Sequence, residues 1–384
     1  MKRPLGLALP AVVLLSVFWT PRAGAQSGWP LWSRYAARFI SPEGRVMDPD
    51  RNSMTTSEGQ SYAMFFALVA GDSASFERLR GWTESNLAQG DLSRHLPSWS
   101  WGKRDDGSWQ VLDQNSAADS DLWIAYDLLQ AGALWQKPEY THTGKALLAS
   151  IAGDEVAQLP NVGPVLMPGR VELFSKEDHW TINPSYLPLP LIVAASHASP
   201  AGPWKQMAAA LPDWLRRASP SGYAMDWVIY DAAKSSFSPA ADPGNPARSA
   251  RGSYDAIRVY LWAGMTSKDT PGATKLLEIF APMAGLMRTD PSPPETVSPD
   301  GNVLSNSSPP GFSAALVPFL TSSGEKTAAT AQLHLVTAEF DKQTGLLGIP
   351  PRYYDQNLAL FGLGWQEERF RFNPDGTLRV RWKN

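Results

Sequence analysis

Three carboxylates stand where helices are predicted to begin: Glu58, Asp119 and Asp255. In the run Ser57-Glu58-Gly59-Gln60, a hydroxyl residue is followed three positions later by a glutamine, which is the capping-box pattern of a helix start. Asp119 opens a second apolar helical segment, and Asp255 opens a third. Carboxylates are favoured at helix N-termini for structural reasons, so each of these, taken alone, is interpreted as an ordinary cap.

Taken together, the three carboxylates suggest a shared task. Helices packed side by side with the same polarity would gather their first turns around one opening. Hydrolysis of a glycosidic bond needs such a set, because one carboxylic acid protonates the leaving oxygen while a second carboxylate acts as base or nucleophile. Aromatic side chains that suit the apolar faces of sugars lie between the carboxylates in the sequence, and these are Trp99, Trp101, Trp109, Trp180 and Tyr186.

The position of Glu58 poses a difficulty for a general acid. A helix N-terminus favours the ionised carboxylate, whereas a general acid must keep its proton near neutral pH. We therefore expect Glu58 to be buried against aromatic residues or to lie close to Asp119.

Other chemistries find little support in the sequence. There is no cysteine, no HExxH pair, no G-x-S-x-G elbow and no glycine-rich nucleotide loop. The net charge of −3, with both signs mixed along the chain, offers no basic stripe for nucleic acid. The five histidines are widely separated, which disfavours a zinc hydrolase: His95, His142, His179, His197 and His334.

The elements that must position these side chains are mainly helical. Apolar residues recur at helical spacing in about a dozen segments, and no fixed-period repeat is present, which leaves an irregular bundle and a closed toroid both open. The C-terminal residues 369–382 alternate around Asp375-Gly376, which predicts a β-hairpin, and residues 290–310 are interpreted as a surface loop. The predicted helices are 29–39, 57–69, 76–87, 122–134, 145–156, 187–196, 203–217, 253–265, 272–286, 311–321, 327–339 and 354–365.

The first residues are typical of an exported protein. A basic start, a short apolar run and Ala23-Gly24-Ala25 predict a signal peptide over residues 1–25. Residues 26–384 contain no long linker and are interpreted as one catalytic domain. No later segment is apolar enough to span a bilayer, so we expect a periplasmic or secreted protein without a membrane anchor after cleavage.

Six ordered blocks resemble glycoside hydrolase family 8, and within it the periplasmic endoglucanases encoded with bacterial cellulose synthases. The resemblance spans nearly all of the mature chain. The blocks are residues 55–62 (TTSEGQSY), 96–103 (LPSWSWGK), 115–125 (NSAADSDLWIA), 183–188 (NPSYLP), 253–260 (SYDAIRVY) and 354–362 (YDQNLALFG).

This resemblance implies an all-α fold, an (α/α)6 toroid with a minor C-terminal β-hairpin, and a cleft at the N-terminal ends of the inner helices. It implies hydrolysis of internal β-1,4-glucosidic bonds with inversion and without a metal or organic cofactor, with Glu58 as proton donor and Asp255 as general base. Asp119 is sometimes labelled a nucleophile in the family, but inversion forms no glycosyl-enzyme, so we interpret it as a ligand of the distorted sugar. The expected substrate-binding residues are Trp101, Asp119, Trp180, Tyr186 and Arg258.

The partner expected from the resemblance is a cellulose or cello-oligosaccharide chain, with a functional association with the cellulose synthase complex. Related members also act on chitosan, lichenan or xylan, and a non-catalytic glucan-binding guide protein is a further alternative. Ala118 and Ser120 depart from the usual signature, which has a hydroxyl residue and Ala or Gly at these places. Inversion predicts about 6.5 to 9.5 Å between the Glu58 and Asp255 carboxyl groups, whereas retention predicts about 5 to 5.5 Å.

Overall fold

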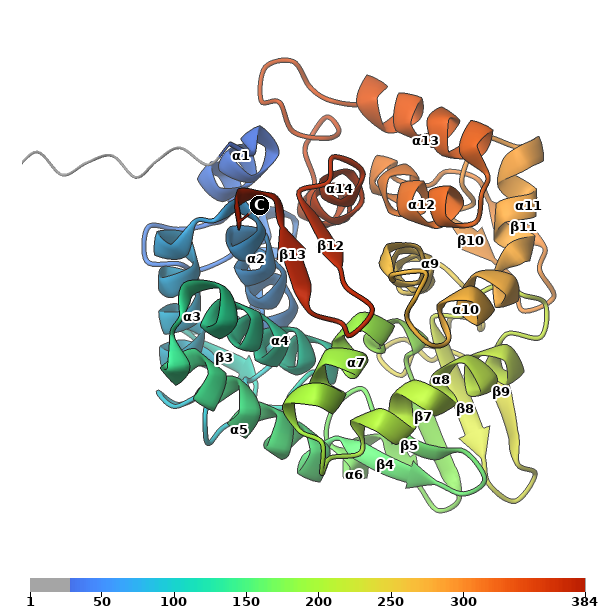
Figure 1. Cartoon of the computed structure of the whole chain (residues 1–384), viewed down its shortest axis with the longest axis horizontal. Coiled ribbons are helices and arrows are strands. Elements are labelled where there is room, and N and C mark those ends of the chain that lie inside the picture. Colours follow the sequence, from blue (N-terminus) through green and yellow to red (C-terminus); the bar gives the residue numbers. More distant parts are fainter. Residues whose placement is uncertain (1–27, 384) are drawn as a thin grey trace, which may run out of the picture.

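Six helices with almost no polar face form the inner ring of a toroid (Figure 1). The computed structural model describes residues 28–383, so the predicted signal peptide lies outside the described residues. A helix that is apolar all round is stable only when it is buried on every side, and nearly every residue of the first two inner helices is buried. The inner helices are α2 (Ser57–Ala70), α4 (Ala118–Trp135), α7 (Leu189–Ala198), α9 (Ala256–Met265), α12 (Pro310–Ser322) and α14 (Tyr353–Gln366).

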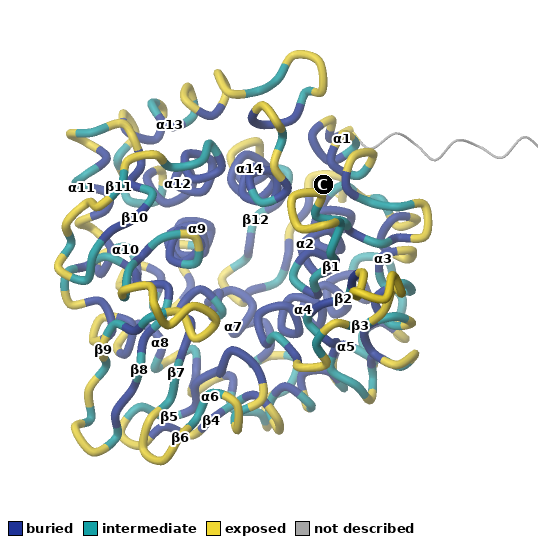
Figure 2. Tube along the Cα trace, turned by 180° about the vertical axis from the view of Figure 1, so that it is seen from behind, coloured by how far each residue is buried: buried dark blue, intermediate teal, exposed yellow. Residues whose placement is uncertain are grey.

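The outer helices each bury one face against this ring and expose the other. In one of them, α8, the buried residues Trp204, Met207, Leu211 and Leu215 recur at helical spacing. The tube in Figure 2 shows the inner ring buried and the exposed residues on the periphery. The outer helices are α1 (Pro30–Phe39), α3 (Ser73–Leu87), α5 (Pro138–Asp154), α8 (Trp204–Ala218), α10 (Ala273–Ile279), α11 (Ala281–Thr289) and α13 (Lys326–Ala338).

The chain alternates between the two rings. Inner helices α2, α4, α7, α9 and α12 are each followed in sequence by an outer helix, and α14 closes the ring against α1 and α2. The predicted all-α (α/α)6 toroid is therefore confirmed. No helix among residues 28–383 is long and apolar enough to cross a membrane.

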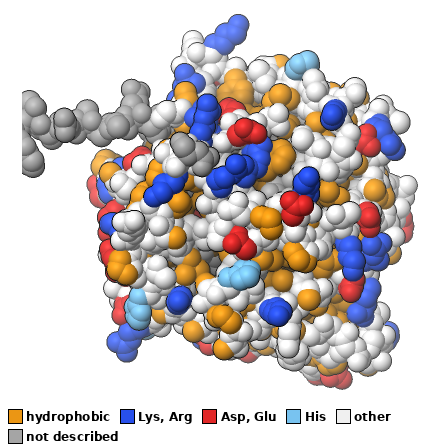
Figure 3. All heavy atoms as spheres, in the orientation of Figure 1, with side chains coloured by type: hydrophobic (Ala, Val, Ile, Leu, Met, Phe, Trp, Pro, Cys, Tyr) orange, Lys and Arg blue, Asp and Glu red, His pale blue; other side chains and the backbone are white. Residues whose placement is uncertain are grey.

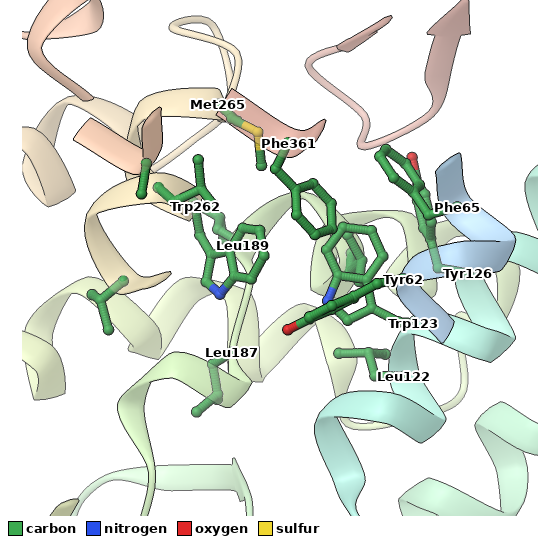
Figure 4. Close-up of a cluster of buried hydrophobic side chains, with 14 of the residues drawn as sticks. Tyr62, Phe65, Leu122, Trp123, Tyr126, Leu187, Leu189, Trp262, Met265 and Phe361 are labelled. Atoms are coloured by element: carbon green, nitrogen blue, oxygen red, sulfur yellow. The ribbon is translucent and has the colours of Figure 1, made fainter. Parts of the chain in front are cut away.

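An aromatic cluster fills the space between the inner helices (Figure 4). Phe361 of α14 lies at its centre, with ring centroids 5.0 Å from Tyr62, 5.4 Å from Phe65 and 5.1 Å from Trp262. Trp123 of α4 lies 5.3 Å from the same ring. Such edge-to-face and offset contacts add to the free energy of area burial. The cluster joins four inner helices, and it fixes the positions from which their first turns project.

Among residues 28–383, five small sheets lie on the toroid, and the sequence predicted only the last of them, the C-terminal hairpin. The strands of the largest sheet pair antiparallel in the order β6-β7-β8-β9. The predicted loop over residues 290–310 contains a short hairpin, β10-β11, so that interpretation was incomplete. The strands are β1 (Thr55–Thr56), β2 (Ser100–Lys103), β3 (Trp109–Asp113), β4 (Val156–Leu159), β5 (Gly163–Leu166), β6 (Ser175–Lys176), β7 (His179–Ile182), β8 (Trp227–Asp231), β9 (Ser236–Ala240), β10 (Thr296–Val297), β11 (Val303–Ser305), β12 (Phe370–Phe372) and β13 (Leu378–Val380).

The predicted C-terminal hairpin, β12-β13, is present and packs across the ring. The Tyr126 hydroxyl donates to the carbonyl of Gly376 at 2.9 Å, and the Gln130 side chain accepts from the Leu378 amide at 2.9 Å. Both contacts come from the later turns of α4, away from its first turn. Figure 3 shows the face that carries this hairpin, with positive and negative side chains interspersed. Short helices complete the fold: α6 (Val171–Phe174), η1 (Pro49–Arg51), η2 (Pro184–Tyr186) and η3 (Arg381–Lys383).

Candidate active site

The first turns of three inner helices meet around one arginine. Glu58 lies in the first turn of α2, Asp119 lies in the first turn of α4, and Asp255 immediately precedes α9. Arg258, the third residue of α9, contacts all three carboxylates. The expectation that these helix starts converge on one place is confirmed.

The start of α2 differs from the predicted capping box. The cap is Thr56, whose hydroxyl oxygen accepts from the Gly59 amide at 3.1 Å, so Ser57 is not the cap. Gln60 does not reach back to the helix start. Its buried side chain instead accepts from the Val46 amide at 2.6 Å and donates to the Thr83 hydroxyl at 2.9 Å. The capping-box prediction was wrong because the buried Val46 amide and the buried Thr83 hydroxyl of α3 also need hydrogen-bond partners, and Gln60 supplies them.

The start of α9 is also shifted from the prediction. The helix begins at Ala256, and Asp255 occupies the N-cap position without accepting a capping hydrogen bond through its side chain. Its carboxylate is therefore available for Arg258. Asp119 is held more tightly, because its Oδ1 accepts from the Ser120 amide at 2.8 Å.

Arg258 is almost fully buried, with only 5% of its side chain exposed. Its Nη2 lies 2.6 Å from Asp255 Oδ1, and its Nη1 forms an ion pair with Glu58 and lies 3.8 Å from Asp119 Oδ2. A planar guanidinium offers several donors in fixed directions, which a lysine cannot do. The arginine thus holds the Glu58 and Asp255 carboxylates at two different nitrogens.

Neutral side chains also hold Arg258 in place through hydrogen bonds. Nη1 donates to the Tyr62 hydroxyl at 3.2 Å, which connects the site to the aromatic cluster of the toroid. Nη2 donates to the Ser185 hydroxyl at 3.2 Å, and the ring of Tyr186 lies 6.0 Å from the guanidinium carbon. The predicted residues Arg258 and Tyr186 are therefore both brought to the carboxylates.

Three carboxylates contact one buried cation, so negative charge exceeds positive charge in the site. The pKa values of Asp119 and Asp255 are raised. Burial, followed by the nearby charge of Glu58, raises the pKa of Asp119 to about 7, although Arg258 opposes the shift. Burial also raises the pKa of Asp255 to about 6, Arg258 lowers it, and Asp226 and Glu58 raise it further. The site therefore contains carboxyl groups that can exchange protons near neutral pH.

A cavity of about 320 Å³ opens over these groups. The side chains of Glu58 and Asp255 are 28% and 29% exposed, whereas that of Asp119 is only 4% exposed. Two carboxylates are thus open to a bound molecule, while Asp119 lies on the cavity wall with little of its side chain exposed. Aromatic side chains on the cavity wall are Trp99, Tyr186, Tyr353 and Tyr354.

Two predicted sugar platforms lie outside this cavity wall. Trp101 on β2 stacks on Trp109 at 5.3 Å, and the Arg45 guanidinium lies over both rings. Trp180 on β7 packs against Tyr230, with ring centroids 6.1 Å apart. Neither tryptophan is brought to the carboxylates themselves.

The sequence reasoning missed several residues around the carboxylates. Tyr353 and Tyr354 stand at the start of α14. The signal that could have found them is the block at 354–362, which opens a helix as the blocks at 55–62, 115–125 and 253–260 do. Ser120, noted only as a departure from the signature, accepts from the Ser57 hydroxyl at 2.9 Å and so joins the starts of α2 and α4. Among residues 28–383, no group of three or more His, Cys, Asp or Glu side chains is arranged to hold a metal ion.

The amino-acid sequence of this chain is similar to those of known glycosyl hydrolases. The family model for glycosyl hydrolases family 8 matches residues 7–368. An endoglucanase of Xanthomonas axonopodis pv. citri is 43% identical over 365 residues, covering 94% of this chain and 91% of that protein. An endoglucanase of Escherichia coli K12 is 41% identical over 358 residues, covering 92% of this chain and 91% of that protein.

Solved structures agree with the sequence relatives. The crystal structure of an endo-1,4-D-glucanase from Vibrio fischeri superimposes with a TM-score of 0.84 at 39% identity, covering 93% of this chain and all of that chain. An endo-β-1,4-glucanase from Acetobacter xylinum gives a TM-score of 0.69 at 27% identity, covering 88% of this chain and 97% of that chain. The toroid and the carboxylate cluster described above therefore occur in a chain that resembles endoglucanases along most of its length.

Proposed function

From the premise that this chain belongs to glycosyl hydrolases family 8 and is a glycoside hydrolase of the endoglucanase type, we propose that it cleaves internal β-1,4-glucosidic bonds with inversion. The observation that carries the proposal is the convergence of Glu58, Asp119 and Asp255 on Arg258 beneath an open cavity. Residues 26–384 form one catalytic domain in this proposal, supported by a continuous hydrophobic core that includes residues from Trp29 to Val380.

Glu58 is the general acid in this proposal and Asp255 is the general base. Asp255 accepts a proton from a water molecule, whose oxygen forms a bond to the anomeric carbon. The glycosidic bond breaks at the opposite face of the sugar, and Glu58 transfers its proton to the leaving oxygen. Both side chains are partly exposed in the cavity, as contact with water and substrate requires. The two carboxylates bind different nitrogens of Arg258, so each is held in the cavity by its own contact.

Arg258 keeps the base ionised and must release the acid. Its Nη2 contact with Asp255 stabilises the carboxylate form that accepts a proton. Its Nη1 contact with Glu58 stabilises a carboxylate where the mechanism needs a protonated acid, so this ion pair opens before the proton is donated. We assign Asp119 to the sugar beside the scissile bond, where hydrogen bonds to ring hydroxyls strengthen in the transition state.

The roles of Glu58 and Asp255 are tested by neutral substitutions of similar shape. Glu58→Gln and Asp255→Asn are each expected to lower the rate of reducing-end release from carboxymethylcellulose by about 10² to 10⁴-fold, the usual contribution of a general acid or base. Glu278→Gln, at an exposed position on α10, serves as the matched control with unchanged rate. Retained activity in either site variant would remove that residue from its role.

Inversion is tested independently by the anomeric form of the product. Proton NMR of cellopentaose hydrolysis is expected to show the α-anomer first, before mutarotation, because water attacks the face opposite the departing oxygen. Initial formation of the β-anomer would mean retention, and Asp255 or Asp119 would then have to act as nucleophile.

The substrate in this proposal is cellulose or a cello-oligosaccharide chain. The printed names of the relatives, endoglucanase and endo-1,4-D-glucanase, support it. Initial rates on carboxymethylcellulose, lichenan, xylan and chitosan are expected to be highest on the first. A higher rate on any of the other three polymers would reassign the substrate and leave the mechanism in place.

The place of action in this proposal is the periplasm or the exterior, reached through a signal peptide over residues 1–25. The basic start and apolar run of that segment support it. We further propose that the enzyme acts on glucan made by a cellulose synthase, on the strength of the six sequence blocks. In a cellulose-producing strain that lacks its own endoglucanase, this chain is expected to restore the cellulose yield and the Asp255→Asn variant to leave it unrestored. Equal restoration by both would mean that hydrolysis is not what synthesis requires.

A further inference from the structure

A fourth carboxylate, Asp226, lies next to the proposed base but outside the contacts of Arg258. It immediately precedes β8, nearly thirty residues before Asp255 in the sequence, and it is largely buried. It lines a groove of about 200 Å³ that also includes Asp255 on its wall. The mechanism given above assigns it no role.

Asp226 satisfies the free backbone amides at the start of α9. Its Oδ1 accepts from the amides of Ser253 at 2.7 Å, Asp255 at 3.2 Å and Ala256 at 2.9 Å. Its Oδ2 accepts from the Ser253 hydroxyl at 2.5 Å. The first amides of a helix have no partner within the helix and normally bind the side chain of the N-cap residue.

The N-cap residue here is Asp255 itself, and its side chain does not form a capping bond. If the Asp255 carboxylate capped α9, it would point back toward its own helix and away from the cavity. Because Asp226 takes over these amides, the Asp255 carboxylate can point to Arg258 at 2.6 Å and remain partly exposed. Asp226 thus caps α9, while Asp255 contacts Arg258 in the cavity.

The charge of Asp226 also acts on Asp255. Like charges in a poorly solvated place disfavour each other, and Asp226 is among the groups that raise the pKa of Asp255, after burial and against the lowering by Arg258. Glu58 and Asp119 add further negative charge from α2 and α4, while Asn183, Tyr186 and Tyr354 face the same carboxylate from other elements. Charged residues on the shared groove are Asp242, Arg248 and Arg251.

We propose that Asp226 is a positioning residue for catalysis, which caps α9 in place of Asp255 and whose negative charge makes Asp255 a stronger base. The inference rests on the proposed role of Asp255. It assigns a function to a residue that no sequence block singled out. Its two parts, geometry and charge, can be separated by substitution.

Asp226→Asn tests the charge, because the amide oxygen can still accept the three backbone bonds. The acid limb of the kcat/KM against pH profile, measured on cellopentaose, is expected to move to lower pH by about one unit, since a neighbouring negative charge that favoured protonation is gone. The value of kcat/KM at the optimum is expected to fall by less than about tenfold, because the base stays in position.

Ser253→Ala is the matched control, since it removes one hydrogen bond to Asp226 and keeps the charge. Its acid limb is expected to stay at the wild-type pH. Asp226→Ser, which is also neutral and is a favoured capping residue type, provides a second test of the charge if the asparagine variant does not fold. Thermal melts of each variant establish that the fold is intact.

The outcomes distinguish this inference from the proposed function. If Asp255→Asn abolishes activity but the acid limb of folded Asp226→Asn or Asp226→Ser coincides with that of the wild type, the charge effect is overturned and the base assignment stands. If Asp255→Asn keeps its activity, the base assignment itself fails. A shifted limb in Ser253→Ala as well would mean that capping geometry, and not charge, sets the base strength.

Discussion

Helix α4 carries acidic residues into two environments that differ in two respects, the presence of a paired cation and the presence of an open cavity. Asp119 in its first turn faces Arg258 and the cavity, together with Glu58 and Asp255. Asp121, two residues later, is fully buried and faces Glu155, the residue that follows α5. No ion pair among residues 28–383 includes Asp121 or Glu155.

The buried pair can be stable only if it holds a proton. Both oxygens of Asp121 and Oε2 of Glu155 have no donor among the described groups, and the Ser116 hydroxyl donates to Oε1 of Glu155 at 2.5 Å. Burial raises the pKa of Glu155 to about 7 and that of Asp121 well above its usual value. Two facing carboxyls without a cation can hydrogen-bond only when one is protonated.

The comparison shows how the same residue type serves chemistry in one place and structure in the other. Where a guanidinium is present and the cavity is open, carboxylates can stay charged and exchange protons with a substrate. Where both are missing, the two carboxyls share a proton and link two elements, because Asp121 lies in the first turn of α4 and Glu155 immediately precedes β4. If the cation makes the difference, its removal should have the largest effect.

Arg258→Met is expected to inactivate the enzyme and to destabilise it most. It would leave Glu58, Asp119 and Asp255 crowded without their cation, and removal of one partner of a buried ion pair costs about 3 to 5 kcal/mol of unfolding free energy. Urea unfolding at pH 7 and cellopentaose kinetics measure both effects. Arg258→Lys keeps the charge but not the fork of donors, so it should recover stability more than activity. A methionine variant with wild-type rate would show that the cation is not needed.

Asp119→Asn and Asp121→Asn form a matched pair on one helix. Asp119→Asn is expected to lower kcat by about 100-fold, because hydrogen bonds to the distorted sugar supply several kcal/mol in the transition state. Asp121→Asn should change kcat by less than about threefold, since its amide can donate to Glu155 and replace the shared proton. Steady-state kinetics on cellopentaose measure kcat for both variants. Equal losses in both variants would mean that the buried pair belongs to the catalytic site.

Glu155→Gln is expected to change how stability depends on pH. The pKa of Glu155 is raised in the folded protein, so its contribution is complete below its unfolded value and is lost as pH rises through about 7. At about 1.4 kcal/mol for each pH unit, this group can account for a fall of up to about 3 kcal/mol between pH 5 and pH 8. Urea unfolding across that range should show a smaller fall for the variant.

Glu139→Gln is the control for that experiment, because Glu139 lies at an exposed position in the first turn of the same helix, α5. In this control, the free energy of unfolding should fall between pH 5 and pH 8 by as much as in the wild type. If Glu155→Gln shows the same fall as the wild type, other carboxyls such as Asp119 account for the whole pH dependence of stability.

The sequence predicted the parts of the site that depend on local pattern. Apolar spacing identified the inner helices, and carboxylates at their starts could be placed at one opening because parallel helices share an end. Arg258 was expected among the substrate-binding residues because of the resemblance to the family. These inferences needed only helical periodicity and the family blocks.

The parts that escaped prediction depend on contacts between distant residues. Asp226 caps α9, which begins thirty residues further along the chain. No local sequence pattern predicts a cap from so distant a residue. Thr56 and Ser57 are both hydroxyl residues at a helix start, so only the strand pairing of Thr56 with Ser100 distinguishes them. Trp101 and Trp180 were candidates by composition, and their place is set by strands whose pairing was not predicted.

Asp127, two turns after Asp119 on the same helix, provides the smallest expected effect. It is fully buried, neither carboxyl oxygen has a partner among the described groups, and burial raises its pKa well above the usual value. If it is already neutral, Asp127→Asn replaces one uncharged side chain by another of the same shape. The free energy of unfolding at pH 6 should change by less than about 1 kcal/mol, and kcat should stay the same. Urea unfolding that shows a loss of about 3 kcal/mol or more would mean that Asp127 is charged and paired. A cation would then no longer separate the two kinds of acidic site on α4.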